Sequence, residues 1–161
     1  MALLLKDVKP GQGEEIIEQE KRISPRSQSR RTALQALYQW QINNSDIHDI
    51  VKQFSEAERL SNLDIDLFHE LVNAIVVQYE ELDALYAEFL DRKVEMIDPV
   101  EKTILRIGTY ELKHSLSIPY KSVIDEAVEL TKSFGAEASH KYINGILDKV
   151  AKNLRSIEIN G

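Results

Sequence analysis

Ser24-Pro-Arg-Ser-Gln-Ser-Arg30-Arg-Thr-Ala-Leu-Gln35-Ala-Leu-Tyr-Gln-Trp40-Gln-Ile-Asn43 is the stretch that says most about the architecture of this chain. It opens with a hydroxyl residue followed by proline, which is typical of a helix N-cap and first turn. Downstream, apolar residues recur at helical spacing and share one stripe: Ala33, Leu34, Leu37 and Trp40. The sequence therefore predicts an amphipathic helix from Ser24 to about Asn43.

The same helix carries an unusual concentration of positive charge at its start. Between Lys21 and Arg31 there are five basic residues and no acidic one, whereas the whole chain has a net charge of −7. If the apolar stripe is extended toward the start of the helix, it passes through Arg30 and Arg26. Arginines are not buried without a partner. We therefore expect this end of the helix to project beyond the body, to bind an anion, or to fray. In an acidic chain, such a local basic patch makes short single-stranded RNA the first partner to consider.

Length and composition favour one soluble all-helical domain. The chain has 161 residues, 43% of them hydrophobic, with six glycines, four prolines and no cysteine, so thiolate metal sites and disulfides are excluded. The apolar opening Ala2–Leu5 is too short for a signal peptide or a membrane span. We expect a cytoplasmic protein with no membrane contact.

The periodicity predicts a compact all-α bundle of about seven helices. After the first helix, starts are expected near Ser45-Asp46, Asp64, Asp98-Pro99, Pro119 and Ala136, and the pattern from Asp64 either continues or breaks near Gln78. The predicted organisation is a flexible N-terminal extension at residues 1–23, a helical domain at 24–155 and a tail at 156–161.

The residues give no support for catalysis or for a cofactor. There is no glycine-rich phosphate loop, and the four histidines are far apart. His69-Glu70 begins like a zinc-protease helix, but position 73 is Asn, so the second ligand is missing. We therefore predict neither a catalytic residue nor a metal site.

Two helical faces remain as binding candidates. Arg31, Gln35 and Tyr38 follow one another along one side of the first helix, where they could contact phosphate, base edges and base faces. The alternative is a solvated flank. On the last helix, Lys141, Tyr142 and Gly145 point away from the apolar stripe, and suit either the approach of a base or partner, or tight helix packing by the glycine.

Three further residues have two readings each. Glu111 falls inside the apolar arc of the helix that starts near Asp98-Pro99, and a buried carboxylate needs partners. An internal network is favoured over a protein-binding surface, and Glu101 beside the same arc carries the same choice. Phe134 is expected in the core rather than on a binding surface.

Four blocks of the chain resemble the NusB family. They are Arg30-x-x-Ala33-x-Gln35-Ala-Leu-Tyr38-x-Trp40-Gln, Val100-Glu-Lys-x-x-Leu105-Arg-Ile-x-x-Tyr110-Glu-Leu, Pro119-Tyr-Lys-x-x-Ile124-x-Glu-Ala-x-Glu-Leu, and Lys132-Ser-Phe-Gly-Ala-Glu-x-Ser-His-Lys141-x-x-Asn144-Gly-x-Leu-Asp148-Lys. The resemblance covers about residues 24–155. It implies an all-helical fold of two packed subdomains without catalysis. It further implies binding of the boxA element of ribosomal RNA leader transcripts jointly with NusE, a ribosomal small-subunit protein, in an RNA polymerase antitermination complex.

The resemblance also implies site residues. Together with the residue patterns above, it gives these RNA-binding candidates: Arg22, Arg26, Arg30, Arg31, Gln35, Tyr38, Lys141, Tyr142 and Asn144. The NusE-facing candidates are Glu101, Arg106 and Phe134. This chain departs from the family pattern where Ser27 and Gln28 interrupt the arginine run, where Ala138 replaces an acidic residue, and in residues 1–23, for which the pattern offers no counterpart.

The sequence also leaves room for two other functions and for a homodimer. A protein-only helical adaptor would carry the basic segment merely as a tail and bind no specific RNA. An RNA-modifying enzyme would need a cofactor domain, for which this chain is too short. A homodimer that covers the RNA surface is compatible with the periodicity.

Overall fold

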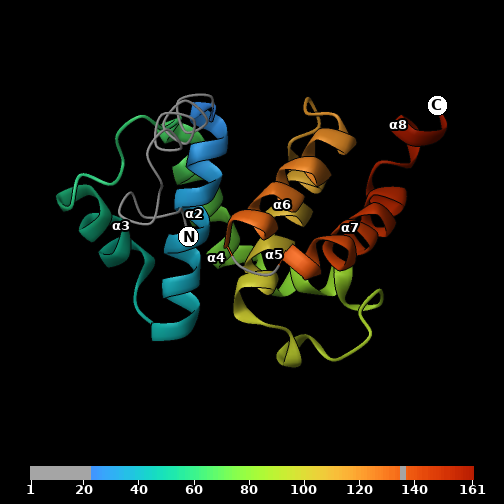
Figure 1. Cartoon of the computed structure of the whole chain (residues 1–161), viewed down its shortest axis with the longest axis horizontal. Coiled ribbons are helices and arrows are strands. Elements are labelled where there is room, and N and C mark those ends of the chain that lie inside the picture. Colours follow the sequence, from blue (N-terminus) through green and yellow to red (C-terminus); the bar gives the residue numbers. More distant parts are fainter. Residues whose placement is uncertain (1–22, 135–136) are drawn as a thin grey trace, which may run out of the picture.

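The computed structural model describes residues 23–134 and 137–161, and this part of the chain is all α-helical, with no strand (Figure 1). The α-helices are α2 (Pro25–Asn43), α3 (Ile47–Glu56), α4 (Ile65–Ala87), α5 (Pro99–His114), α6 (Tyr120–Phe134), α7 (His140–Leu154) and α8 (Ser156–Asn160). Short 3₁₀ turns, η2 (Val94–Met96) and η3 (Glu137–Ser139), precede α5 and α7. The prediction of an all-α bundle is confirmed.

The predicted helix starts are held by the expected caps. The Ser24 hydroxyl oxygen accepts a hydrogen bond from the backbone N–H of Ser27, at 3.0 Å. Asp46 caps α3 and Asp64 caps α4 in the same way, and Asp98 caps α5 by accepting from two backbone N–H groups. Each cap satisfies amide donors that the first helical turn leaves without an intrahelical acceptor.

The pattern from Asp64 left a continuous helix and a break near Gln78 open, and the structure shows one uninterrupted helix, α4. Two elements differ from the sequence-based expectations. The last long helix begins at His140, because Glu137–Ser139 form a 3₁₀ turn instead of its first turn. Residues 156–160, expected as a tail, form the short helix α8. Of the predicted extension, only Ile23 lies within the described residues, and Arg22 lies outside them.

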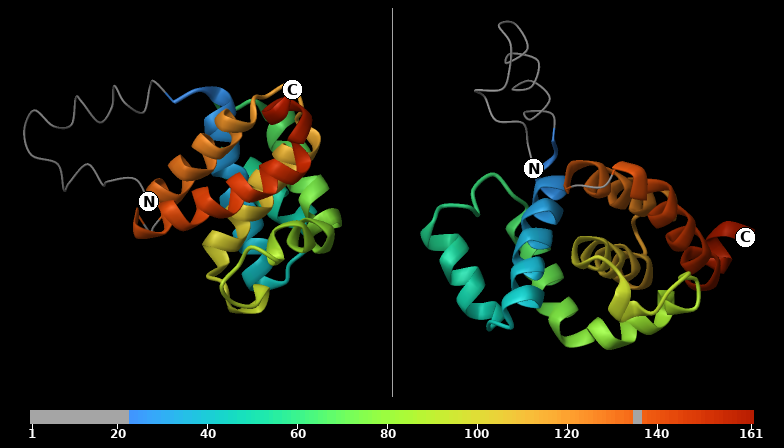
Figure 2. Two further views of the ribbon diagram at one scale, coloured as in Figure 1. Left: turned by 90° about the vertical axis from the view of Figure 1, so that its right-hand side faces the viewer. Right: turned by 60° about the horizontal axis from the view of Figure 1, so that its bottom comes forward.

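The helices pack as two groups joined through α5. α2, α3 and α4 contact one another, as do α5, α6 and α7, and α5 also contacts α2 and α4 (Figures 1 and 2). α6 lies between α2 and α7 in these views. No helix in the described part of the chain is long and apolar enough to span a membrane.

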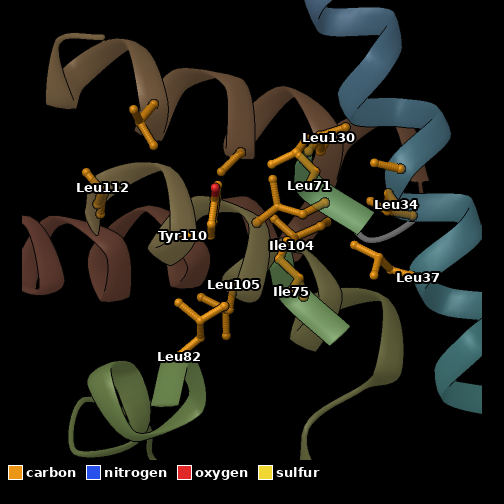
Figure 3. Close-up of a cluster of buried hydrophobic side chains, with 14 of the residues drawn as sticks. Leu34, Leu37, Leu71, Ile75, Leu82, Ile104, Leu105, Tyr110, Leu112 and Leu130 are labelled. Atoms are coloured by element: carbon orange, nitrogen blue, oxygen red, sulfur yellow. The ribbon is translucent and has the colours of Figure 1, made fainter. Parts of the chain in front are cut away.

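One hydrophobic core runs through both groups. Leu34 and Leu37 of α2 meet Leu71 and Ile75 of α4 and Ile104 of α5, and all are buried (Figure 3). The core continues from α5 to α7 through a close approach at Gly108. A Cβ atom at this position would lie only 2.8 Å from Cδ1 of Leu147.

A buried arginine ties the C-terminal end of the chain to the end of α5. Arg155 follows α7 and is almost fully buried. Its guanidinium donates to the backbone carbonyl oxygens of Glu111, Leu112, Ser115 and Ile118 and to the carboxylate of Glu158. Carbonyl groups at the end of a helix lack intrahelical donors, and Arg155 supplies donors to those of Leu112 and Ile118. The Glu111 and Ser115 oxygens also accept from the backbone N–H groups of Ser115 and Ile118.

Candidate nucleic-acid interface

The first turn of α2 is anchored to the start of α4. The Arg26 guanidinium lies 3.1 Å from the Asp64 carboxylate, and both side chains are partly exposed. The Ser29 hydroxyl donates to the Asp64 backbone oxygen at 2.6 Å. This end of the helix is therefore held against the body, and Arg26 keeps a half-exposed positive charge beside it.

Arg30 is the main correction to the sequence-based prediction. It is 4% exposed and forms a bidentate ion pair with Glu111 of α5, which is 1% exposed. Nε lies 2.7 Å from Oε1 and Nη2 lies 2.9 Å from Oε2. The Glu126 carboxylate lies 3.7 Å from Nη1. The expectation that this end of α2 projects or frays is wrong, whereas the internal network expected for Glu111 is confirmed.

Burial and pairing act in opposite directions on this guanidinium. Desolvation favours the neutral form and would lower the pKa of Arg30, but the hydrogen bonds and Coulomb attraction of Glu111 outweigh it and raise the pKa. The group is charged, and its charge is balanced inside the protein. Arg30 is thus not presented to a phosphate, and we correct the prediction that it contacts RNA directly.

The outer face of α2 carries the other three residues expected along this helix. Arg31 is partly exposed and donates to the Ser133 hydroxyl of α6 at 3.1 Å. Gln35 accepts from the Arg59 guanidinium at 2.6 Å, and Tyr38 is 37% exposed. These contacts place the face between α6 and the segment that follows α3. Arg59, which lies 3.9 Å above the Phe54 ring, adds an exposed cation to this face.

The first turns of α7 form a second exposed surface. Lys141 and Asn144 are exposed, and Gly145 has no atom within 4 Å of the position of an added Cβ. Tight helix packing at Gly145 is therefore excluded as the explanation for this glycine. Tyr142 is only partly exposed, because its ring packs against the core, and its hydroxyl donates to the Asp91 carboxylate at 2.8 Å. That contact orients the ring toward the segment between α4 and η2.

The end of α6 connects these two surfaces. α6 contacts both α2 and α7. The Arg31–Ser133 hydrogen bond fixes its last turn against α2. Phe134, the last residue of α6, is partly buried and packs against the core, as the favoured reading expected. Arg31 and Ser133, which are 102 positions apart in sequence, thus lie side by side at the last turn of α6.

Of the residues expected to face a protein partner, Glu101 has exposed surface, whereas Arg106 is buried. Glu101 is partly exposed and accepts a hydrogen bond from the Ser139 hydroxyl of η3. Arg106 is only 6% exposed, with Nε and Nη2 at 2.9 and 2.8 Å from the two Asp83 carboxylate oxygens. Its guanidinium also lies 5.0 Å from the centre of the Tyr79 ring. Arg106 therefore supports the α4–α5 packing, and the prediction that it contacts a partner directly is corrected.

Comparison with known proteins gives the same family by three routes. A family model described as the NusB family matches residues 27–152. A transcription antitermination protein NusB of Hydrogenovibrio crunogenus is 60% identical over 154 residues, covering 96% of both chains. The corresponding protein of Actinobacillus succinogenes is 47% identical over 85% of this chain and 96% of its own.

The first of these matches also bears on the N-terminal extension. With 154 of 161 residues of this chain matched, only seven lie outside the match, so most of residues 1–23 fall within it. The family model, by contrast, begins at residue 27, so the extension lies outside the family pattern, as expected, but is largely matched in this relative.

Solved structures agree with the fold. A crystal structure of the antitermination factors NusB and NusE in complex with dsRNA contains a chain that is 27% identical, with a TM-score of 0.69, covering 79% of this chain and 96% of that one. A NusB from T. maritima is 29% identical, with a TM-score of 0.67, covering 78% and 90%. The match of the family model to residues 27–152 and the 60% identity over 96% of both chains lead to one conclusion: this chain belongs to the NusB family of transcription antitermination proteins.

Proposed function

We propose that this chain acts as a transcription antitermination factor that binds boxA-type single-stranded RNA of ribosomal RNA leader transcripts together with NusE. The complex would act on RNA polymerase to prevent premature termination. The observation that carries the proposal is membership of the NusB family, with a curated antitermination protein at 60% identity over nearly the whole chain. A related NusB has been solved with NusE and RNA, which supports the same partners here.

The geometry suggests how the RNA would be held. Arg26, Arg31 and Lys141 would neutralise phosphates, since each carries a side chain with exposed surface. Arg31 lies against the last turn of α6 through Ser133, whereas Arg26 lies beside the start of α4 through Asp64. Tyr38 offers a partly exposed ring for a base, and base–aromatic stacking contributes about 1–3 kcal/mol per base. Gln35 and Asn144 add amide groups that can address base edges. Arg22, outside the described residues, stays a candidate for phosphate binding from the sequence alone.

Arg30 has an indirect role in this proposal. Its ion pair with Glu111 fixes the first two turns of α2, and thereby the neighbouring Arg31. The protein partner would meet a different surface, around Glu101 and η3, with Phe134 at its border. Neither surface requires catalysis, so the proposed role is that of a binding protein and not an enzyme. A cytoplasmic location follows from the proposed action on nascent transcripts.

The test is fluorescence anisotropy with a labelled boxA RNA and a scrambled RNA, each with and without NusE, at several salt concentrations. Three neutralised phosphates predict a slope of log K against log salt of about −2 for single-stranded RNA. A double-stranded boxA arm separates strand preference from sequence preference. Lys141→Gln should make this slope less negative. Lys52→Gln, on the exposed face of α3, is a charge-matched control that should leave the slope unchanged.

A protein-only adaptor is the second candidate, and one observation favours it. Arg30 is committed to Glu111 and Arg26 is paired with Asp64, so fewer free cations remain than the sequence suggests. Selective boxA binding that strengthens with NusE would support the antitermination role and refute the adaptor. Equal, weak binding to both RNAs, unchanged by NusE, would favour the adaptor.

A further inference from the structure

The segment between α4 and η2 forms a small polar cluster with the first turn of α7. The Asp91 carboxylate accepts hydrogen bonds from the Tyr142 hydroxyl at 2.8 Å and from Arg92 Nε and Nη2 at 2.7 and 3.1 Å. The backbone N–H of Asp91 also donates to the Tyr142 oxygen at 3.3 Å. One carboxylate thus orients both an aromatic ring and a guanidinium.

Arg92 is placed so that part of its hydrogen-bonding capacity stays available. Its side chain is 51% exposed, and its guanidinium carbon lies 5.7 Å from the centre of the Tyr142 ring. Nη1 makes no hydrogen bond to any residue in the described part of the chain, and an arginine fork carries five N–H donors. The Asp91 pair uses two of them, which leaves donors for an incoming anion.

The electrostatics of the cluster are compatible with an anionic ligand. Hydrogen bonds from Arg92 and from Tyr142 lower the pKa of Asp91 to about 2, so it is a carboxylate at neutral pH. Arg92 is followed by the exposed Lys93, and Tyr142 is preceded by the exposed Lys141. Three cations therefore lie at or beside the Asp91 carboxylate, and the Coulomb attraction of Glu101 also acts on Arg92.

We infer that Arg92 and Tyr142 form one nucleotide-binding subsite, in which the arginine holds a phosphate and the ring contacts the adjoining base, with Asp91 as the positioning residue. This inference rests on the proposed RNA-binding function. It extends the RNA path from α7 onto the connection between α4 and η2, which the sequence pattern did not indicate. A guanidinium held over an aromatic ring loses less freedom on binding than a free surface arginine does, which favours binding at this place.

The proposed role of Asp91 is to position Tyr142 and Arg92, and this role can be distinguished from the effect of its charge. A carboxylate near a phosphate is repulsive, so its removal should strengthen RNA binding if it only contributed charge. If instead it holds the ring and the guanidinium in place, removing it should not strengthen binding. The sign of the change therefore separates positioning from simple electrostatics.

The experiment uses the full chain and boxA RNA, with and without NusE, over a salt series. Arg92→Gln should weaken binding roughly three- to tenfold and reduce the salt slope by about 0.7, the share of one phosphate on a single strand. Tyr142→Phe keeps the ring and removes the hydroxyl, so it should weaken binding with an unchanged slope. Asp91→Asn should leave binding equal or weaker, and its effect should not add to that of Tyr142→Phe. Lys52→Gln is the charge-matched control, and circular dichroism establishes that each variant is folded.

The outcomes separate this inference from the proposed function. If the wild-type chain binds boxA RNA selectively while Arg92→Gln changes neither affinity nor slope, the subsite is refuted and the proposed function stands. Tighter binding by Asp91→Asn would refute the positioning role. If the wild-type chain binds no RNA under any condition, the proposed function fails and the subsite fails with it.

Discussion

The buried pair of Arg30 and Glu111 should be sensitive to the loss of one partner. Glu111→Gln keeps the shape of the side chain but removes its charge, and it turns an amide N–H toward a guanidinium that can only donate. Breaking a buried ion pair on one side costs about 3–5 kcal/mol. The Glu126 carboxylate, 3.7 Å from Nη1 of Arg30, offers partial compensation. We therefore expect a cost at the lower end, about 3 kcal/mol.

Denaturant unfolding measures this cost directly. The midpoint should fall at an unchanged m-value, which indicates a change in stability alone. For a chain of this size, the melting temperature should drop by roughly 10 °C. Glu56→Gln, on the exposed face of α3, is the matched control and should change stability by less than about 0.5 kcal/mol.

A double variant then separates the charges from the packing. Arg30→Met with Glu111→Leu removes both charges and replaces them by apolar side chains of similar size. Such replacements of buried pairs are often neutral or stabilising, so the double variant should be more stable than Glu111→Gln alone. Because Arg30 does not reach the surface, removing its charge should leave the salt slope of RNA binding equal to that of the wild-type chain.

Two results would refute this reasoning. A cost below about 1 kcal/mol for Glu111→Gln would mean that the pair is not desolvated as the structure shows. A folded double variant with a salt slope reduced by about 0.7 would mean that Arg30 contacts a phosphate after all.

Three further predictions concern other contacts. Asp98→Ala removes the N-cap of α5 and should cost about 1 kcal/mol, measured by denaturant unfolding. Arg155→Met removes the guanidinium donors from the carbonyl oxygens of Leu112 and Ile118 and should cost about 3 kcal/mol in the same assay. The Asp91 carboxylate should titrate at about 2 in a carbon-13 NMR series and closer to its ordinary pKa in Arg92→Gln. Because the folded pKa is depressed, its stabilising contribution is present above the ordinary aspartate pKa and is lost as the pH falls toward 2.

The helical framework could be predicted from sequence because its signals are local. Ser24-Pro25 and Asp98-Pro99 each combine a cap with proline in the first turn, and both start helices where expected. Apolar residues at helical spacing then gave the buried faces. The 3₁₀ turn before His140 was missed, since the apolar pattern of α7 does not reveal which residues start it.

The arginine and glutamate inside the core were both recognised as anomalies, but not as each other's partners. Arg30 falls on the backward extension of an apolar stripe, and Glu111 falls within an apolar arc. The two are 81 positions apart, and helical periodicity carries no information about which faces of two distant helices meet. Arg92 and Arg59 were missed for a related reason. Both lie in connections outside the helices, where no period marks an inward or outward side.

The interruption of the arginine run now has a structural reason. Ser27 is partly buried between α2 and α6, and its hydroxyl lies 3.0 and 3.1 Å from the two Glu126 carboxylate oxygens. The same carboxylate lies 3.7 Å from Nη1 of Arg30. An arginine at position 27 would therefore meet a contact between helices and not open solvent. Along this part of α2, positions 27 and 30 therefore face other helices, whereas Arg26 and Arg31 keep exposed surface. Arg30 and Ser27 hold α2 in place, so the cations proposed for RNA are Arg26 and Arg31 on either side of them and the distant Lys141 and Arg92.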